Sequence, residues 1–316
     1  MFRDSIDKLI LEASLVLVSI KNYERNGDMK QKRAIQRKEV RTAWLFLLPS
    51  LIGITVFILI PFIDAVRRSF YEAMSGRFIG LENYRNVFTN KAFLLAAKNT
   101  GRFMLTCIPL LLLLSLFLSI LIFGLKRYGD FLKTTFLIPM AIPVASVVLL
   151  WQMIFHNNGL LNKIISTFGG QTIDWMHSSS AFYVLVFSYL WKNIGYDMVL
   201  WLAGLNGIST SLYEAASIDG AGTWHRFRYI TLPGLLPTLF LVSVLSVINS
   251  FKVFREAYLI AGNYPDSSIY MLQHLFNNWF ITLDIQKISA TAVIVALIIL
   301  IFIIGMQWIG NKGEVE

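Results

Sequence analysis

Residues 214–233 read EAASIDGAGTWHRFRYITLP, a polar segment that separates two long apolar stretches, 181–205 and 235–260. Each apolar stretch exceeds the roughly 20 residues that a helix needs to cross the hydrocarbon core of a membrane. The polar segment begins with helix-forming alanines and contains two glycines, Gly220 and Gly222, which permit backbone geometries closed to other residues. We therefore expect two short helices joined by a turn, held outside the membrane between two spans.

The rest of the chain is largely apolar. Of its 316 residues, 56% are hydrophobic and 15% are charged, a charged fraction well below that of soluble domains. The apolar runs lack the alternation of a β-barrel, and a membrane segment must pair its own backbone polar groups, which favours helices. The sequence predicts an all-α, polytopic membrane protein with six transmembrane helices. The expected spans are 44–63, 103–123, 131–155, 181–205, 235–260 and 288–309.

The polar segment matches a known pattern. Its fixed positions, separated by constant spacings, are Glu214, Ala215, Ala216, Gly220, Ile230, Leu232 and Pro233. This pattern resembles the EAA loop in the membrane subunits of ATP-binding-cassette (ABC) importers. The resemblance implies a type I permease fold, with a loop over 207–233 that docks on a cytosolic ATPase and carries its movement into the membrane. The implied coupling residues are Glu214, Ala215, Ala216, Asp219, Gly220, Gly222, Trp224, Phe227, Ile230 and Pro233.

Local chemistry adds expectations for this loop. A serine, Ser209 or Ser211, is placed to cap the first helix, and Glu214 would then lie in its first turn, where the helix dipole favours a carboxylate. A second short helix is expected over 223–229. Pro233 would fit the first turn of the following span, where its missing N–H costs little.

Further motifs resemble the carbohydrate-uptake members of the same importers. They are GLENY at 80–84 followed by Asn99 and Thr100, Trp151 and Phe155 before NGLLN at 158–162, and LAGLNGI at 202–208. Over 261–266 the chain departs from the family's Thr-x-Gly-Gly-Pro turn, with AGNYPD instead. The resemblance covers residues 44–312 as one permease domain. It implies a bacterial cytoplasmic membrane, a cytosolic ABC ATPase dimer, a second related permease, and an extracellular sugar-binding lipoprotein or periplasmic binding protein.

Basic residues bear on orientation. The net charge of +9 would suggest nucleic acid in a soluble protein, but a membrane protein retains Lys and Arg at its cytoplasmic ends, so no nucleic-acid partner is expected. Eight basic residues between 21 and 41 place the N-terminal segment, 1–43, in the cytosol. Seven more between 67 and 102 would then lie outside, against this rule. The predicted orientation is kept because the EAA resemblance requires its loop to be cytosolic.

Polar residues interrupt the fourth and fifth expected spans. Such residues are costly in a membrane and usually face the protein interior or a water-filled path. Amide and hydroxyl groups suit sugar hydroxyls, and Trp or Tyr rings can stack on a sugar ring. The predicted substrate path comprises Trp191, Asn193, Tyr196, Ser246, Asn249 and Ser250. The alternative is that these side chains bridge neighbouring helices. Lys252 and Glu256, four residues apart, are expected to form a structural ion pair.

The sequence thus favours a transport subunit for a sugar or oligosaccharide, without catalytic residues, metal or cofactor. It contains no P-loop, its four His show no metal-ligand spacing, and Cys107 is expected to be a small buried hydrophobe. Alternatives are a permease for glycerol phosphate or a polyamine, a secondary transporter, or a membrane-embedded enzyme. A polyamine path needs acidic residues, a secondary transporter needs helical repeats, and an enzyme needs a convergent set of His, Asp, Glu or Cys.

Overall fold

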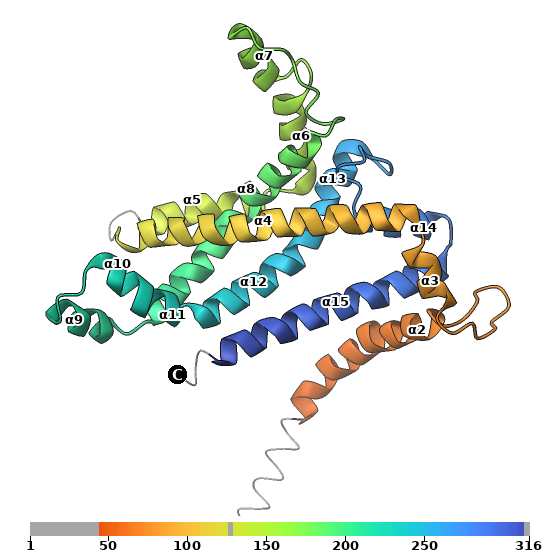
Figure 1. The fold of residues 1–316 in the computed structure, drawn as a ribbon, viewed down its shortest axis with the longest axis horizontal. Coiled ribbons are helices and arrows are strands. Elements are labelled where there is room, and N and C mark those ends of the chain that lie inside the picture. Colours follow the sequence, from red (N-terminus) through yellow and green to blue (C-terminus); the bar gives the residue numbers. More distant parts are fainter. Residues whose placement is uncertain (1–43, 126–128, 313–316) are drawn as a thin grey trace, which may run out of the picture. The chain divides into compact units, whose positions relative to one another are not determined.

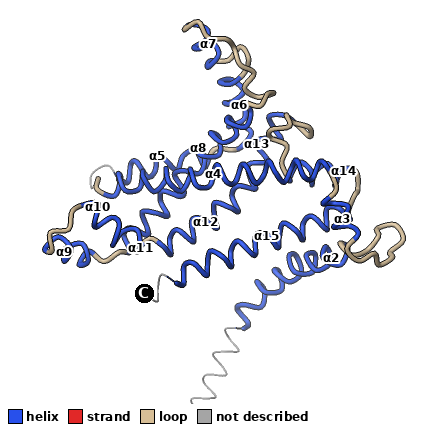
Figure 2. The backbone as a smooth tube through the Cα atoms, in the orientation of Figure 1, coloured by secondary structure: helices blue, strands red, loops and turns tan. Residues whose placement is uncertain are grey.

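The computed structural model describes residues 44–125 and 129–312, and most of this part of the chain is helical (Figure 1). Figure 2 shows helices joined by loops throughout, and the described residues contain only an isolated β-bridge, between Tyr71 and Phe78. The predicted all-α class is therefore confirmed. The predicted cytosolic segment, 1–43, lies outside the described residues.

The described chain forms two units that meet between Asp64 and Ala65. The first unit is an apolar helix that begins at Trp44 and passes through a π-helical turn, η1 (Thr55–Leu59), into α2 (Ile60–Arg68). Pro61 explains the wide π-helical turn of η1, because its ring would clash with the carbonyl group four residues earlier in a regular α-helix. The predicted first span, 44–63, lies within this helix.

The second unit contains the remaining helices. They are α3 (Glu82–Phe88), α4 (Lys91–Phe123), α5 (Gly129–Ala141), α6 (Val144–Phe155), α7 (Leu160–Thr167), α8 (Ala181–Gly207), α9 (Thr210–Ile218), α10 (Thr223–Arg226), η2 (Phe227–Thr231, a π-helix), α11 (Leu232–Gly234), α12 (Leu236–Ser250), η3 (Phe251–Val253, a 3₁₀-helix), α13 (Phe254–Ala261), α14 (Leu272–Ile281) and α15 (Ile285–Lys312). Figure 1 shows α9 and α10 at one end of this unit and α3 and α14 at the opposite end.

Helix α8 is the central helix of the second unit, packed against α4, α5 and α12. Buried hydrogen bonds hold it there. The indole of Trp201 donates to Ser115 Oγ of α4 at 3.0 Å, and the indole of Trp151 in α6 donates to Ser188 Oγ of α8 at 2.8 Å. Because protein surrounds α8, this helix can carry polar side chains that a lipid-facing helix could not.

Two glycines set how closely other helices approach α8. A Cβ atom at Gly195 would overlap the carbonyl oxygen of Phe136 in α5, and one at Gly204 would overlap the side chain of Thr238 in α12. Small residues at such positions allow backbones to pack closely, which is how helices gain dispersion contacts inside a membrane. These contacts fix α5 and α12 on either side of the central helix.

Five helical stretches among the described residues are long and apolar enough to cross a membrane. They are Trp44–Arg68, Lys91–Phe123, Val144–Thr167, Leu236–Leu259 and Ile285–Trp308. The expected spans 103–123 and 288–309 fall in α4 and α15. Helix α8, expected to span over 181–205, is absent from the five, and it carries Lys192 and Asp197. The polytopic membrane class is confirmed, whereas the count of six stays a prediction.

Two of the expected spans are broken helices, which corrects the sequence-based prediction. The stretch 131–155 divides between α5 and α6, because Pro143 has no N–H to continue α5 and instead caps the start of α6. The stretch 235–260 divides at η3, a tighter turn between α12 and α13. Each break leaves backbone groups without regular helical partners.

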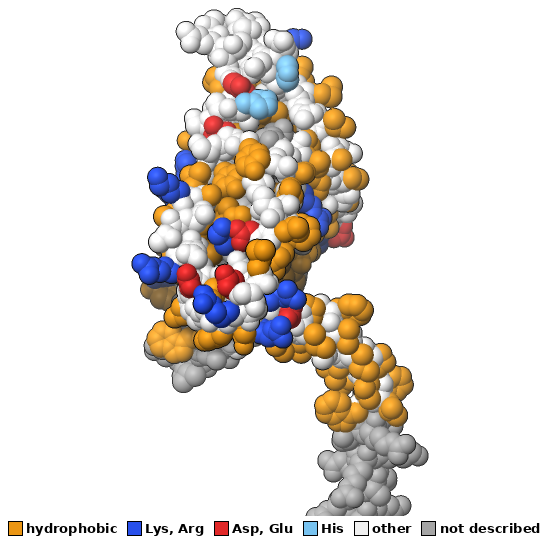
Figure 3. Space-filling view, turned by 90° about the vertical axis from the view of Figure 1, so that its right-hand side faces the viewer, with side chains coloured by type: hydrophobic (Ala, Val, Ile, Leu, Met, Phe, Trp, Pro, Cys, Tyr) orange, Lys and Arg blue, Asp and Glu red, His pale blue; other side chains and the backbone are white. Residues whose placement is uncertain are grey.

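The surface of the second unit separates apolar flanks from a charged end. Large side chains on α4 and α15 are exposed, among them Leu105 at 79% and Ile301 at 69%, which suits contact with lipid. Figure 3 faces the end with α3 and α14, where Lys and Arg side chains gather among Asp and Glu. This end is suited to water rather than to the hydrocarbon core.

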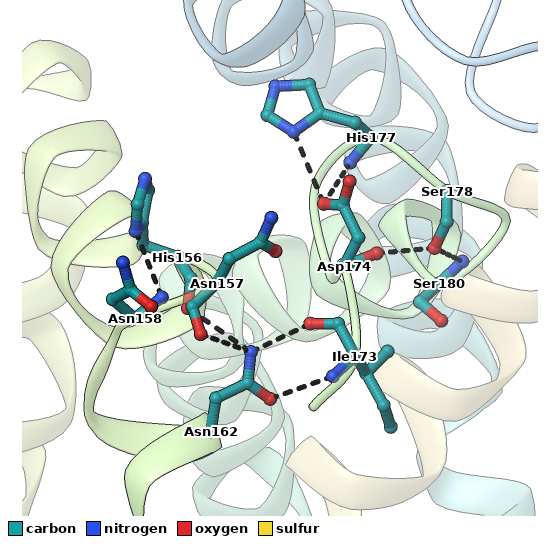
Figure 4. Close-up of polar contacts among 9 residues, drawn as sticks. All are labelled: His156, Asn157, Asn158, Asn162, Ile173, Asp174, His177, Ser178 and Ser180. Carbon is teal, nitrogen blue, oxygen red and sulfur yellow. Dashed lines mark hydrogen bonds and ion pairs between the residues drawn. The ribbon is translucent and has the colours of Figure 1, made fainter. Parts of the chain in front are cut away.

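The loop between α6 and α8 is organised by Asn162 (Figure 4). Its Nδ2 donates to the carbonyl groups of Asn157 at 3.0 Å and Ile173 at 2.8 Å. Its Oδ1 accepts from the backbone N–H of Ile173 at 3.1 Å and from the Trp175 indole at 3.0 Å. The side chain is buried, so these bonds satisfy it and tie the two arms of the loop together. This explains the asparagine that ends the NGLLN motif.

Candidate functional site

The loop 207–233 forms two short helices, α9 and α10, between α8 and α12. Helix α9 begins at Thr210, so Glu214 lies in its second turn and not in its first turn as predicted. Ser209 occupies the N-cap position in an extended conformation, but its hydroxyl group bonds to Ser211 Oγ at 2.7 Å rather than capping the helix. Neither serine therefore acts as the expected side-chain cap.

The turn between the two helices depends on Gly220. Its φ is +79°, in the left-handed region that side chains disfavour. Its N–H donates to the carbonyl of Ser217 at 3.2 Å, and the N–H of Ala221 donates to Ala216 at 2.8 Å. This pair of bonds is the Schellman motif, which satisfies the last carbonyl groups of α9 and reverses the chain. Gly222 has a negative φ and is the N-cap of α10.

The expected second helix, 223–229, changes character within its length. It is α-helical over α10 and then π-helical over η2, which leads into α11. Pro233 lies in the first turn of α11, as predicted, and the wide turn before it repeats the arrangement at Pro61. The coupling loop thus continues into the fifth span as one helical path.

The loop is attached to the base of that span by side chains. Tyr213 Oη of α9 lies 2.9 Å from Thr231 Oγ1 of η2, within hydrogen-bonding distance. Gly234 packs so close to Ile208 that an added Cβ would lie 3.0 Å from its side chain. A largely apolar pocket of about 270 Å³ lies between the loop and the end of α4, with Phe123 and Phe227 in its lining. These contacts favour movement of α9 together with α12.

The predicted coupling residues divide by exposure. Half-buried members are Ala216, Phe227 and Ile230; exposed members are Glu214, Ala215, Asp219, Gly220, Gly222, Trp224 and Pro233. Trp224 is 73% exposed although it is large and apolar. Ile218 is 88% exposed at the end of α9, and it was not among the residues predicted from the sequence. The sequence did contain a signal for it, because an isoleucine inside a polar loop suggests an apolar contact with a partner.

The predicted substrate-path residues also divide. Asn193 and Asn249 line one pocket of about 150 Å³ between α8 and the two broken helices. Its lining comprises Met140, Val144, Tyr189, Lys192, Asn193, Asn249, Val253, Arg255 and Glu256. Substrate contact by these two asparagines stays a prediction, with a cavity now identified beside them.

The other predicted path residues do not line this pocket. Ser246 Oγ donates to Asp197 Oδ2 at 2.8 Å, and Ser250 Oγ donates to the carbonyl of Val247 in its own helix at 2.6 Å. Trp191 packs edge-on against Trp151, with ring centroids 5.2 Å apart. Tyr196 is half-buried and is not part of the pocket lining. The contact of Ser246 favours the helix-bridging alternative, whereas Ser250 bonds within its own helix.

Glu256 forms an ion pair with a residue of another helix, and the expected pair with Lys252 stays a prediction. Glu256 Oε1 of α13 lies 3.0 Å from Lys192 Nζ of α8. The side chain of Lys252 lies outside the described part. The observed partners are 64 residues apart in the sequence, so helical spacing could not have indicated them.

Comparison with known proteins identifies the class of protein to which these features belong. Residues 112–312 match the family described as the inner membrane component of binding-protein-dependent transport systems. The chain belongs to this family, which confirms the resemblance of the EAA pattern. It is a multi-pass membrane subunit of such a transport system.

Individual relatives cover nearly the whole chain. It is 32% identical over 303 residues to the probable ABC transporter permease protein YesP of Bacillus subtilis (strain 168), covering 91% of this chain and 97% of that protein. It is 29% identical over 283 residues to the trehalose/maltose transport system permease protein MalF of Thermococcus litoralis, covering 88% and 96%. A chain in the crystal structure of a bacterial ABC transporter that imports the acidic polysaccharide alginate shares the fold, with a TM-score of 0.74 at 22% identity, covering 87% and 98%.

Proposed function

We propose that the chain is the permease subunit of an ATP-driven importer for a sugar or oligosaccharide. The observation that carries the proposal is the coupling loop, which has the EAA spacing and presents exposed apolar side chains at one end of a membrane-spanning unit. Support for sugar as the cargo comes from the relative named for trehalose and maltose transport, and from the two asparagines in the pocket beside α8.

The proposed assembly contains four kinds of component besides the lipid bilayer. A dimer of cytosolic ABC ATPases binds ATP, so this chain needs no ATPase site of its own. A second, related permease completes the pathway, and a sugar-binding protein delivers cargo from outside. The N-terminus and the coupling loop lie in the cytosol, in the bacterial cytoplasmic membrane. Closure of the ATPases moves α9 and α10, and the attached α12 transmits this movement to the pathway.

Docking on the ATPase would explain why apolar residues of the loop are exposed in the isolated chain. Ile218 and Trp224 are exposed at a water-facing position, where burial by a partner would be favourable by about 25 cal/mol per Å² of apolar surface. Ile218→Asp should therefore weaken copurification of the ATPase and reduce uptake at least tenfold. Ile218→Leu, which retains an apolar side chain, is the matched control and should remain near wild type. Equal uptake by the two variants would contradict this docking surface.

Uptake by whole cells tests the cargo class. A deletion strain and the complemented strain would be compared with radiolabelled trehalose, maltose, lactose, glycerol 3-phosphate and spermidine. We expect complementation to restore uptake of at least one of the sugars. Restoration of glycerol 3-phosphate or spermidine uptake alone would replace sugar with the corresponding alternative while leaving the permease assignment intact.

A further inference from the structure

A small polar pocket lies where two broken helices face α8. Met140 of α5 and Val144 of α6 line it on either side of the break at Pro143, and Val253 of η3 lines it at the second break. Irregular backbone at membrane depth is tolerated only where it is buried in protein or lines a water-filled cavity. Breaks of this kind accompany the binding sites of other membrane transporters for the same reason.

Two residues in the lining of this pocket, Lys192 and Glu256, form an ion pair, and one carboxylate oxygen of Glu256 has no hydrogen-bond donor among the described residues. Lys192 Nζ contacts Glu256 Oε1 at 3.0 Å, and the two side chains are only 16% and 6% exposed. The second carboxylate oxygen, Glu256 Oε2, is buried and accepts no hydrogen bond within the described part of the chain. Leaving a buried acceptor without a donor costs about 1–3 kcal/mol, and more when the group is charged. A donor from outside these residues would remove that cost.

We infer that Glu256 is a specificity-determining residue of the substrate path, whose Oε2 accepts a hydrogen bond from a hydroxyl group of the transported sugar. This inference rests on the proposed sugar import. A carboxylate only accepts hydrogen bonds, so it selects a donor, and a hydroxyl group supplies one. Lys192 occupies the other oxygen and holds the carboxylate in place. Asn193 and Asn249 lie in the same lining, and Asn193 Nδ2 already donates to the carbonyl of Tyr189 at 2.8 Å, which leaves its Oδ1 as an acceptor for an adjacent hydroxyl group.

The pocket is smaller than most ligand-binding pockets. Ligand pockets commonly measure about 300–1,000 Å³, whereas this one measures about 150 Å³. We therefore expect a sugar to enter only when the segments on either side of the breaks separate. Glu256 lies on α13, immediately after the second break, so this separation would expose Oε2, which has no donor among the described residues.

The test compares the wild-type complex with the charge-balanced double variant Lys192→Met/Glu256→Leu, which removes the acceptor. Both are reconstituted with saturating binding protein and supplied with radiolabelled trehalose, maltose or lactose, or with single-deoxy analogues of each sugar. In the wild type, the analogue that lacks the contacted hydroxyl group should move on the order of tenfold more slowly than its parent. In the double variant, parent and analogue should move at equal rates. An undiminished preference in the double variant would overturn the inference.

Two further measurements distinguish sugar binding by Glu256 from a purely structural role. Glu256→Asp keeps a negative charge beside Lys192 but withdraws the carboxylate, so it too should lose the preference, and it serves if the double variant does not assemble. If the pair only joined α8 to α13, the melting temperature would fall while the preference stayed. Failure of the proposed function looks different, because the wild-type complex itself would then transport none of the three sugars and the role of Glu256 would fall with it.

Discussion

At the scale of single residues, the backbone conformation of Gly220 is the sharpest constraint in the coupling loop. Its φ of +79° closes the Schellman motif, and a Cβ atom at this position would meet nothing within 4 Å. A side chain there is thus opposed by backbone strain and not by crowding. Gly222 is two residues away, has a φ of −67°, and is equally open. Substitutions at the two glycines therefore distinguish the effect of backbone conformation from the effect of steric crowding.

Gly220→Val should reduce uptake strongly, because a β-branched residue in a left-handed conformation costs about 1–3 kcal/mol and would disturb the angle between α9 and α10. Gly222→Ala should retain near-normal uptake, and Gly220→Asn should be intermediate because asparagine tolerates this conformation. The measurement is the uptake rate at matched amounts of protein in the membrane. Similar losses for Gly220→Val and Gly222→Ala would show that the turn geometry is not what matters.

His274 provides a pH dependence at the same scale. It lies in α14, outside the expected spans, is fully buried, and accepts a hydrogen bond at Nδ1 from the Met271 N–H at 3.2 Å. Burial lowers the pKa of His274 to about 4. Because the unfolded chain has a pKa near 6.5, it binds more protons than the folded protein between these values. Stability is therefore present above pH 6.5 and is lost as the pH falls towards 4.

We expect this histidine to remove up to about 3 kcal/mol of the free energy of unfolding across that pH window. Thermal unfolding of the purified complex, measured from pH 7.5 down to pH 5, gives the slope. His274→Asn keeps an acceptor near the Met271 N–H and removes the titrating group, so its melting temperature should vary less with pH. Parallel slopes for the two proteins would assign the acid sensitivity to other groups.

At the scale of elements, the fold depends on how closely α5 and α12 approach α8. Gly195 has no room for a side chain, since a Cβ atom would overlap the backbone of α5 at Phe136. Gly207, the last residue of α8, has nothing within 4 Å of an added Cβ atom. Substitution of each glycine by alanine therefore distinguishes the cost of overpacking between helices from the gain in intrinsic helix propensity.

Gly195→Ala should destabilise the complex by about 1–3 kcal/mol or more, because overpacking displaces a backbone and not a flexible side chain. Gly207→Ala should be neutral or slightly stabilising, since alanine is the better helix former. Melting temperature and yield after extraction from membranes report both effects. Tolerance of alanine at position 195 would mean that α5 and α8 lie further apart than the structure indicates.

The elements also show what the sequence could and could not predict. Apolar runs located α4 and α15, because composition alone decides whether a lipid-facing helix exists. The EAA spacing located the two helices of the loop, but it could not show that the hydroxyl group of Ser209, at the N-cap of α9, bonds to Ser211 instead of the helix backbone. The break at Pro143 carried a signal in the proline itself, yet the continuous apolar run concealed it.

The candidate pocket was harder to predict than the loop. Asn193 and Asn249 were selected for their chemistry, which a sequence displays directly. The contact between Lys192 and Glu256 joins residues that are distant in the chain, and only the packing of α13 on the rest of the unit brings them together. For the same reason, Ser246 could not be assigned before its partner on α8, Asp197, was known, whereas the bond of Ser250 to Val247 in its own helix is local.

At the scale of the whole molecule, the second unit has α9 and α10 at one end and α3 and α14 at the opposite end (Figure 1). The coupling loop continues through η2 and α11 into α12, and α12 ends at the break that borders the candidate pocket. In the proposed mechanism, a displacement of α9 by the ATPase would reach the pocket along this path. Helix α8, which packs against α12 and also lines the pocket, supplies the fixed wall.

The central position of α8 has a consequence for biogenesis. A charged residue near the middle of a helix adds about 2.5–3.5 kcal/mol to the cost of entering the bilayer, and α8 contains both Lys192 and Asp197. The ionic partner of Lys192 is synthesised 64 residues later. We therefore expect α8 alone to insert poorly in a translocon assay read by glycosylation, and to insert well when α4 precedes it and α12 and α13 follow. Lys192→Leu should allow α8 to insert alone. Newly made chains would thus retain α8 beside the translocon until α13 emerges. Insertion of the fourth span would then depend on synthesis of the fifth.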